Sequence, residues 1–175
     1  MRRLLSRPGA GMQLDQIREP VADELRRLDE VIVARLASDV VLVNQVAQYI
    51  IGGGGKRLRP LSVVLAARAC GYTGGKHVDA AAIIEFIHTA TLLHDDVVDG
   101  SDLRRGKKAA NLIWGNQATV LVGDFLFSRS FELMVEDGSL RVLKILSHAS
   151  AVIAEGEVDQ LTAQVVRRGT RHAHG

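Results

Sequence analysis

The stretch "AAIIEFIHTATLLHDDVVDGSDLRRG", residues 81–106, predicts one long helix that ends near Asp99. Most of its residues are apolar, which is typical of a helix buried among others. Within it His88, Thr91, Asp95 and Asp99 follow one another at intervals of three, four and four residues, so they share one helical face. Such a polar stripe indicates a cavity, because an unpaired buried carboxylate is very costly.

The end of this stretch is acidic, with Asp95, Asp96 and Asp99 close together. These carboxylates repel one another, and at a helix C-terminus they also oppose the macrodipole. Divalent cations would neutralise them, and oxygen ligands suit Mg²⁺, which keeps waters and bridges to phosphate. A solvated acidic helix end is the alternative. His88 by itself could be an ordinary packed histidine, and only its place on the stripe makes it a site candidate.

A second candidate site is "GGGGKRLRP", where glycines precede Lys56, Arg57 and Arg59. A nucleotide-binding phosphate loop needs Ser or Thr directly after the lysine, and Arg57 stands there instead. The three cations therefore predict an anion site of another kind. Arg104 and Arg105, one loop after the acidic cluster, can grip an anion that the metals also hold. Together these features predict a site for two phosphorylated groups, one held by metal and one by cations.

Helical spacing continues through the rest of the chain. The pattern predicts helices over residues 14–36, 38–51, 60–70, 80–99, 111–135 and 140–165. Ser38 or Asp39 is expected to cap the second of these, and Pro60 to open the third. No alternating strand pattern or hairpin turn is found, so the predicted fold is all-α.

Positive charge is concentrated at the two ends of the chain. Six of the 22 Lys and Arg residues lie in the ends, leaving 16 basic against 20 acidic residues in the body. We expect residues 1–11 to be a disordered extension, 12–165 a partial helical domain and 166–175 an aberrant basic tail. A body without a basic face argues against nucleic-acid binding. The single Cys70 and the absence of an apolar run of membrane-span length predict a cytoplasmic protein with no transmembrane segment.

The motifs "GGGGKRLRP" and "LLHDDVVDGSDLRRG", in this order, resemble those of the trans-isoprenyl diphosphate synthases, or polyprenyl synthetases. "VLVGDFLFSRSFELM" and "VIAEGEVDQL" extend the resemblance to roughly residues 14–164. It implies an isoprenoid synthase-type helical bundle around a central cavity, usually homodimeric, of which this chain holds the N-terminal portion. It also implies head-to-tail condensation of isopentenyl diphosphate onto an allylic diphosphate, yielding a long-chain, octaprenyl-like diphosphate for isoprenoid quinone biosynthesis.

The resemblance also implies a role for each matching residue. Asp95, Asp96 and Asp99 correspond to the family's first aspartate-rich motif, a catalytic element, with Asp95 and Asp99 as the Mg²⁺ ligands. Arg104 matches the arginine that contacts the allylic diphosphate. The positions that match the binding site for isopentenyl diphosphate are Lys56, Arg59, His88 and Arg105.

Two further expectations follow from the family pattern. A bulky aromatic residue at the fourth or fifth position before the first aspartate shortens the product, and the small Thr91 and Ala90 stand there, which favours a long chain. The family's second aspartate-rich motif has no counterpart, since no acidic residue follows Asp159. The alternative prediction is therefore a truncated, catalytically incompetent fragment.

Other interpretations stay open from the sequence. The adjacent His94 and Asp95 are of the type that metal-dependent phosphohydrolases use, and a non-catalytic remnant that binds a partner through a helix face is also compatible. Glu157 and Gln160 share a helix face that lines the cavity or is simply solvated. For Asp124 the alternatives are lining the cavity and bonding a neighbouring helix, and the second is expected.

Overall fold

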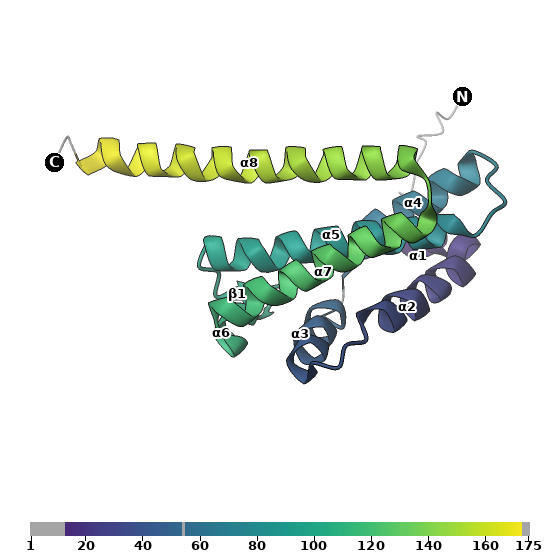
Figure 1. Ribbon diagram of the computed structural model, residues 1–175, viewed down its shortest axis with the longest axis horizontal. Helices are drawn as coiled ribbons and strands as arrows, with labels where there is room; N and C mark the ends of the chain where they lie inside the picture. The colour runs from purple at the N-terminus through teal and green to yellow at the C-terminus, as the bar shows by residue number, and fades with distance from the viewer. Residues whose placement is uncertain (1–12, 54, 173–175) are drawn as a thin grey trace, which may run out of the picture.

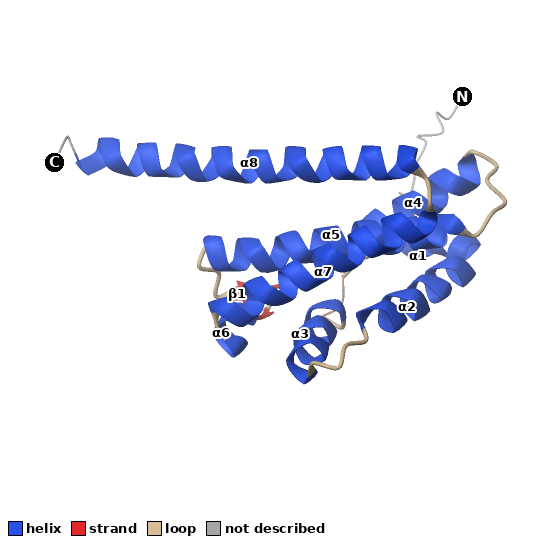
Figure 2. Ribbon diagram, viewed as in Figure 1, coloured by secondary structure: helices blue, strands red, loops and turns tan. Residues whose placement is uncertain are grey.

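The computed structural model describes the backbone of residues 13–53 and 55–172, with side chains up to residue 163, as an assembly of helices with one small hairpin (Figures 1 and 2). The elements are α1 (Leu14–Arg18), the 3₁₀ helix η1 (Glu19–Val21), α2 (Ala22–Leu36), α3 (Val41–Ile51), α4 (Leu58–Ala69), α5 (Lys76–Val98), β1 (Leu103–Arg104), β2 (Lys107–Lys108), α6 (Ala110–Trp114), α7 (Asn116–Asp137) and α8 (Leu140–His172). The prediction of an all-α fold is confirmed.

Helix α5 is the centre of the core. It packs against α7, α4 and α2, and Phe86 and Leu93 on α5 are fully buried with Leu126 and Met134 of α7. Each such side chain contributes roughly 1.5–3 kcal/mol of apolar burial. Because these residues occupy the core side of α5, the remaining side of this helix is left to carry polar groups.

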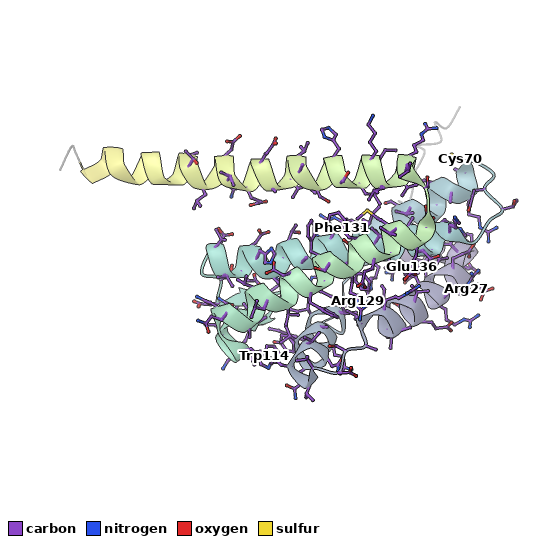
Figure 3. All side chains as sticks on the ribbon, viewed as in Figure 1. Arg27, Cys70, Trp114, Arg129, Phe131 and Glu136 are labelled. Atoms are coloured by element: carbon purple, nitrogen blue, oxygen red, sulfur yellow. The ribbon has the colours of Figure 1, made fainter. Side chains whose placement is uncertain are left out.

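Helix α2 is held on the flank of α7 by polar contacts as well. The Arg35 guanidinium donates to Glu136 through Nη1 at 3.0 Å, and Arg129 donates to the carbonyl of Ala37 at 3.2 Å. Arg129 and Glu136 are the labelled partners on α7 in Figure 3. Arg35 and Glu136 are about half exposed, so their ion pair contributes at most about 1 kcal/mol. These contacts fix the orientation of α2 more than they stabilise it.

The hairpin between α5 and α6 contradicts the prediction that the chain has no strand. Its two turn residues, Arg105 (φ 53°) and Gly106 (φ 77°), both have positive φ, as a type I′ turn requires. Tyr49 of α3 donates its hydroxyl to the carbonyl of Lys108 at 2.8 Å and packs edge-on against Trp114 (Figure 3). Strands of two residues are too short to produce an alternating pattern, so the sequence gives no sign of them.

Several predicted helix starts are also wrong. Ser38 does not cap α3: its hydroxyl accepts from the backbone N–H of Val40 at 3.1 Å, while its own backbone pairs with the side chain of Asn44. Nor does Asp39, since α3 has no side-chain cap. Pro60 is the third residue of α4 rather than its first, because Arg57 adopts a left-handed conformation that starts the helix earlier.

Helix α8 runs alongside α5 and α7, on the side opposite to α2 and α3 (Figure 1). Its backbone stays helical through His172, beyond the predicted end at residue 165, and residues 151–163 are all exposed. The predicted extension over residues 1–11 lies outside the described residues, as do residues 173–175 of the predicted tail. None of the helices in the described residues is long and apolar enough to cross a membrane.

Candidate active site

A cleft of about 450 Å³ separates α5 from α8. Its walls are apolar, with Ile84 and Ile87 on α5 facing Ile153 on α8. The prediction that the polar stripe lines a cavity is confirmed for its first three members, which all contribute to this cleft: His88, Thr91 and Asp95. The fourth, Asp99, is exposed at the end of α5.

A second, cationic pocket of about 400 Å³ lies beside this cleft, where the loop before α4 meets α5 and the hairpin. Four cations line it, together with Glu85 and His88: Lys56, Arg57, Arg59 and Arg105. Arg59 and His88 line the cleft as well, so the two cavities share a wall. The structure thus brings together all four residues that the sequence assigns to isopentenyl diphosphate.

The shared wall is a hydrogen-bonded pair. Arg59 Nη1 lies 2.9 Å from His88 Nε2, and because a guanidinium can only donate, the imidazole Nε2 accepts and its proton is on Nδ1. Burial, followed by the charge of Arg59, lowers the pKa of His88 below its ordinary value. His88 is therefore neutral near pH 7, so it orients Arg59 and offers a hydrogen bond but adds no charge.

Arg105 reaches this pocket because the loop opposite has no side chain in its way. A Cβ added to Gly55 would lie only 2.5 Å from Nη1 of Arg105. A glycine at this position lets a guanidinium from the hairpin lie directly against the backbone next to Lys56. This close approach is one physical reason for a glycine at the end of the run.

The acidic cluster divides into two parts. Asp96 is fully buried, and its carboxylate accepts from Arg104 Nε at 2.8 and 2.9 Å and from Nη2 at 2.6 Å. Among the described side chains, Asp95 and Asp99 form no ion pair. Burial, then the charges of Glu157 and Asp99, raise the pKa of Asp95 above its ordinary value. The three aspartates that the sequence groups together therefore have different surroundings.

The fit to a divalent cation can be judged from these carboxylates. Within the described part of the chain, no three His, Cys, Asp or Glu side chains converge on a point where they could enclose a metal. Asp95 and Asp99 nevertheless offer oxygen ligands without a competing cation. Mg²⁺ is commonly held by one or two carboxylates and completed by water and substrate phosphates. The residues fit an ion that a diphosphate bridges, and they do not form a closed metal site.

His94 belongs to a different contact from its neighbour Asp95. Its Nε2 lies 3.2 Å from Asp124 Oδ1 and 3.3 Å from the carbonyl of Val120, both on α7. The interhelical role expected for Asp124 is confirmed. A Cβ on Gly123 would lie 2.4 Å from His94 Nε2, so a glycine admits this ring between the helices. Because His94 faces α7 and Asp95 faces the cleft, they do not form the joint metal-binding pair of a phosphohydrolase.

Sequence reasoning missed several contacts around the cationic pocket. Arg57, grouped there with the anion-binding cations, instead donates to Glu85 at 2.7 Å. Glu85 stands three residues before His88, on the same helical face, and this spacing could have identified it. Glu157 and Gln160 are both exposed, and of the two Glu157 lines the cleft.

Comparison with known proteins gives these pockets a context. Residues 40–173 match the family model described as polyprenyl synthetase. Octaprenyl diphosphate synthase from Escherichia coli (strain K12) is 58% identical over 150 residues, covering 86% of this chain and 46% of that protein. The enzyme of the same name from Haemophilus influenzae is 50% identical over the same share of each chain.

The solved structures agree with this result. Polyprenyl synthase from Caulobacter crescentus CB15, crystallised with calcium and isoprenyl diphosphate, has a TM-score of 0.84 and 53% identity, covering 88% of this chain and 47% of that one. A decaprenyl diphosphate synthase from Rhodobacter capsulatus has a TM-score of 0.83 and 52% identity, covering 86% and 46%. The helices thus have the arrangement of an isoprenoid-synthase fold.

This chain belongs to the polyprenyl synthetase family. It spans about half the length of the curated relatives it matches.

Proposed function

We propose that this chain carries substrate-binding residues of a trans-polyprenyl diphosphate synthase, which joins isopentenyl diphosphate head-to-tail to an allylic diphosphate. The proposal depends on one observation: the cationic pocket and the apolar cleft, which ends at Asp95, share a wall formed by Arg59 and His88. Such a condensation requires two diphosphates side by side, with the hydrocarbon of one kept away from water. The two adjoining cavities match this requirement.

The cationic pocket is proposed to bind isopentenyl diphosphate. Lys56, Arg59 and Arg105 supply positive charge, and hydrogen bonds between such cations and a diphosphate are among the stronger ones. Neutral His88 holds the Arg59 guanidinium at 2.9 Å. Binding here needs no metal, because the chain itself provides the charge.

The acid end of the cleft is proposed to hold the diphosphate of the allylic substrate through Mg²⁺ on Asp95 and Asp99. Bound there, Mg²⁺ supplies neutralisation of the charge that develops on the leaving diphosphate. Arg104 lines a neighbouring pocket and not the cleft itself, and the buried carboxylate of Asp96 fixes its orientation; we propose that its guanidinium adds to the binding of the allylic diphosphate. In this assignment Asp96 positions Arg104 and is not a metal ligand.

The walls of the cleft are proposed to enclose the growing hydrocarbon. Ile84 and Ile87 shield the allylic cation from water on the α5 side, and Ile153 lies opposite them on an exposed part of α8. Thr91 lines the cleft and is small, which supports a long, octaprenyl-like product for isoprenoid quinone biosynthesis. Ala90 is buried in the core and does not line the cleft, so only one of the two positions bears on product length. A homodimer in the cytoplasm, with Mg²⁺ as the metal, completes the proposal.

The 175 residues are expected to bind substrate far better than they turn it over. The second aspartate-rich motif that the family resemblance implies is missing from this sequence, since no acidic residue follows Asp159. The exposure of residues 151–163 also leaves the α8 side of the cleft open to water. The alternative function proposed for these 175 residues is binding of substrate without turnover.

Isothermal titration calorimetry tests the proposed function. Isopentenyl diphosphate should bind in buffer that contains a chelator, whereas farnesyl diphosphate should bind only when Mg²⁺ is added. A chain that binds neither ligand would overturn the proposed function. Release of inorganic phosphate from either ligand with a transition metal would favour the phosphohydrolase.

A further inference from the structure

The cationic pocket contains one residue of the wrong sign for binding an anion. Glu85 lies in its wall beside Arg59 and Arg105, and the Glu85 side chain is only 12% exposed. A bare carboxylate in this place would repel a diphosphate and would be costly to bury. Its presence therefore needs a reason, and that reason lies in the residue that pairs with it.

Arg57 is that residue. Its Nη1 donates to Glu85 Oε1 at 2.7 Å, its Nη2 lies 3.6 Å from Asp29 Oδ1 of α2, and the Arg57 side chain is 18% exposed. Its backbone has a φ of 46° at the N-cap of α4. A left-handed conformation at a residue other than glycine costs free energy and persists only where surrounding contacts enforce it. Here the two carboxylates hold the side chain of the strained residue.

The backbone on either side of Arg57 presents the cations of the pocket. Lys56 precedes it, with its carbonyl accepting from Arg18 Nη2 of α1 at 2.6 Å, and Arg59 follows it in the first turn of α4. In the described part of the chain, neither Lys56 nor Arg59 forms an ion pair. Of the three cations after the glycines, Arg57 alone is thus neutralised by carboxylates.

We propose that Arg57 and Glu85 form a positioning pair for the diphosphate pocket. Arg57 does not bind the anion: it fixes the left-handed turn that directs Lys56 and Arg59 into the pocket, and it neutralises Glu85. Glu85 in turn anchors the loop to the same face of α5 that carries His88. This inference rests on the proposed function only in so far as the pocket binds a diphosphate.

A double-mutant cycle on the 175-residue chain tests the pair, with inorganic diphosphate and isopentenyl diphosphate titrated calorimetrically without Mg²⁺. Glu85→Gln removes a negative charge from an anion site, so electrostatics alone predicts tighter binding of the diphosphate. Tighter binding is also expected if Arg57, released from Glu85, binds the anion itself. The positioning pair gives the opposite sign: about tenfold weaker binding, or about 1.4 kcal/mol. Arg57→Gln should be weaker still, because it loosens the turn and also exposes the carboxylate of Glu85.

The sign of the Glu85→Gln effect should reverse in the second half of the cycle. In the Arg57→Gln background the substitution removes an unpaired carboxylate, so it should strengthen binding. Glu85→Asp should restore part of the wild-type affinity. Arg26→Gln is the matched control: it removes one positive charge from an exposed ion pair on α2, outside the pocket, and should change affinity less than twofold.

Each outcome decides a different point. A wild-type chain that binds neither diphosphate overturns the proposed function itself. Wild-type binding with equal or tighter binding by Glu85→Gln overturns the positioning pair alone. Loss of helical circular dichroism in Glu85→Gln also overturns it, because the pair would then hold the whole fold together. If Arg57→Gln binds diphosphate as tightly as the wild type, the positioning pair is also overturned.

Discussion

Asp95 and Asp96 are neighbours in the sequence, yet substituting each by asparagine should change stability in opposite directions. Asp96→Asn keeps the shape of a fully buried side chain and removes the negative charge that pairs with Arg104. Asp95→Asn removes a cleft-facing charge that has no ion-pair partner in the described structure. The comparison therefore separates the carboxylate that the fold uses from the one that the site uses.

The magnitude for Asp96 follows from its contacts with Arg104. The carboxylate accepts from Nε and from Nη2, and a hydrogen bond to a charged group contributes about 1.5–3 kcal/mol. The two bonds are not additive, asparagine can keep one of them, and Arg104 is 28% exposed and can recover some hydration. We expect the free energy of unfolding to fall by about 2–3 kcal/mol, which corresponds to about 4–12 °C in Tm.

The sign for Asp95 follows from its raised pKa. An aspartate whose pKa is higher in the folded than in the unfolded state adds stability at pH values below its ordinary pKa, and this stability is lost as the pH rises through the folded value. Near pH 7 the ionised Asp95 therefore opposes folding. Asp95→Asn should be neutral or stabilising at pH 7, and this advantage should shrink as the pH falls toward the ordinary aspartate pKa.

Urea unfolding followed by circular dichroism, in buffer with a chelator at several pH values, measures both variants against the wild type. Equal destabilisation by the two substitutions, or a larger loss for Asp95→Asn, would refute the assignment of separate roles. A loss for Asp95→Asn that grows with pH would contradict the linkage argument directly.

Three more predictions use simple readouts. Gly123→Ala should lower the free energy of unfolding by about 1–2 kcal/mol in a denaturant melt, since its Cβ would lie 2.4 Å from His94 Nε2. Gly156→Ala has open space around it and should be neutral or stabilise by up to about 1 kcal/mol. The reverse order of the two variants would contradict the packing. Gly55→Ala should weaken diphosphate binding about tenfold, about 1.4 kcal/mol, without lowering Tm, because it displaces Arg105; unchanged affinity would remove Arg105 from the pocket. The chain incubated with farnesyl diphosphate, labelled isopentenyl diphosphate and Mg²⁺ should give little or no polyprenyl product on thin-layer chromatography, and robust synthesis would show that these residues suffice.

The helical fold and the polar stripe could be predicted because both depend on local periodicity. Intervals of three and four residues place His88, Thr91 and Asp95 on one face whatever the helix packs against. The same geometry separates Asp95 from Asp96 by about 100° around the axis, so different surroundings for the two could have been expected. Which of them faces the cleft depends on α8, whose position no local pattern in the sequence specifies.

The missed features depend on contacts between residues far apart in the chain. Arg57 and Glu85 are 28 residues apart, and nothing in "KRLRP" distinguishes the cation that pairs with a carboxylate from the two that form no ion pair with the described residues. The hairpin turn was missed because positive φ at Arg105 is uncommon for residues other than glycine. Tertiary contacts also outweighed the capping preference of Ser38, whose backbone is bonded to Asn44 instead.

Two distinct diphosphate sites are proposed to meet at Arg59 and His88. The most direct test of this proposal is calorimetric titration of two ligands into two variants: isopentenyl diphosphate without metal and farnesyl diphosphate with Mg²⁺, each into Arg59→Gln and Asp95→Asn. We expect Arg59→Gln to weaken the binding of isopentenyl diphosphate at least tenfold, about 1.4 kcal/mol. Asp95→Asn should weaken the binding of farnesyl diphosphate by the same factor, while changing the affinity for isopentenyl diphosphate less than about twofold. If Asp95→Asn weakened both ligands equally, or if neither substitution mattered, the two-site account would be contradicted.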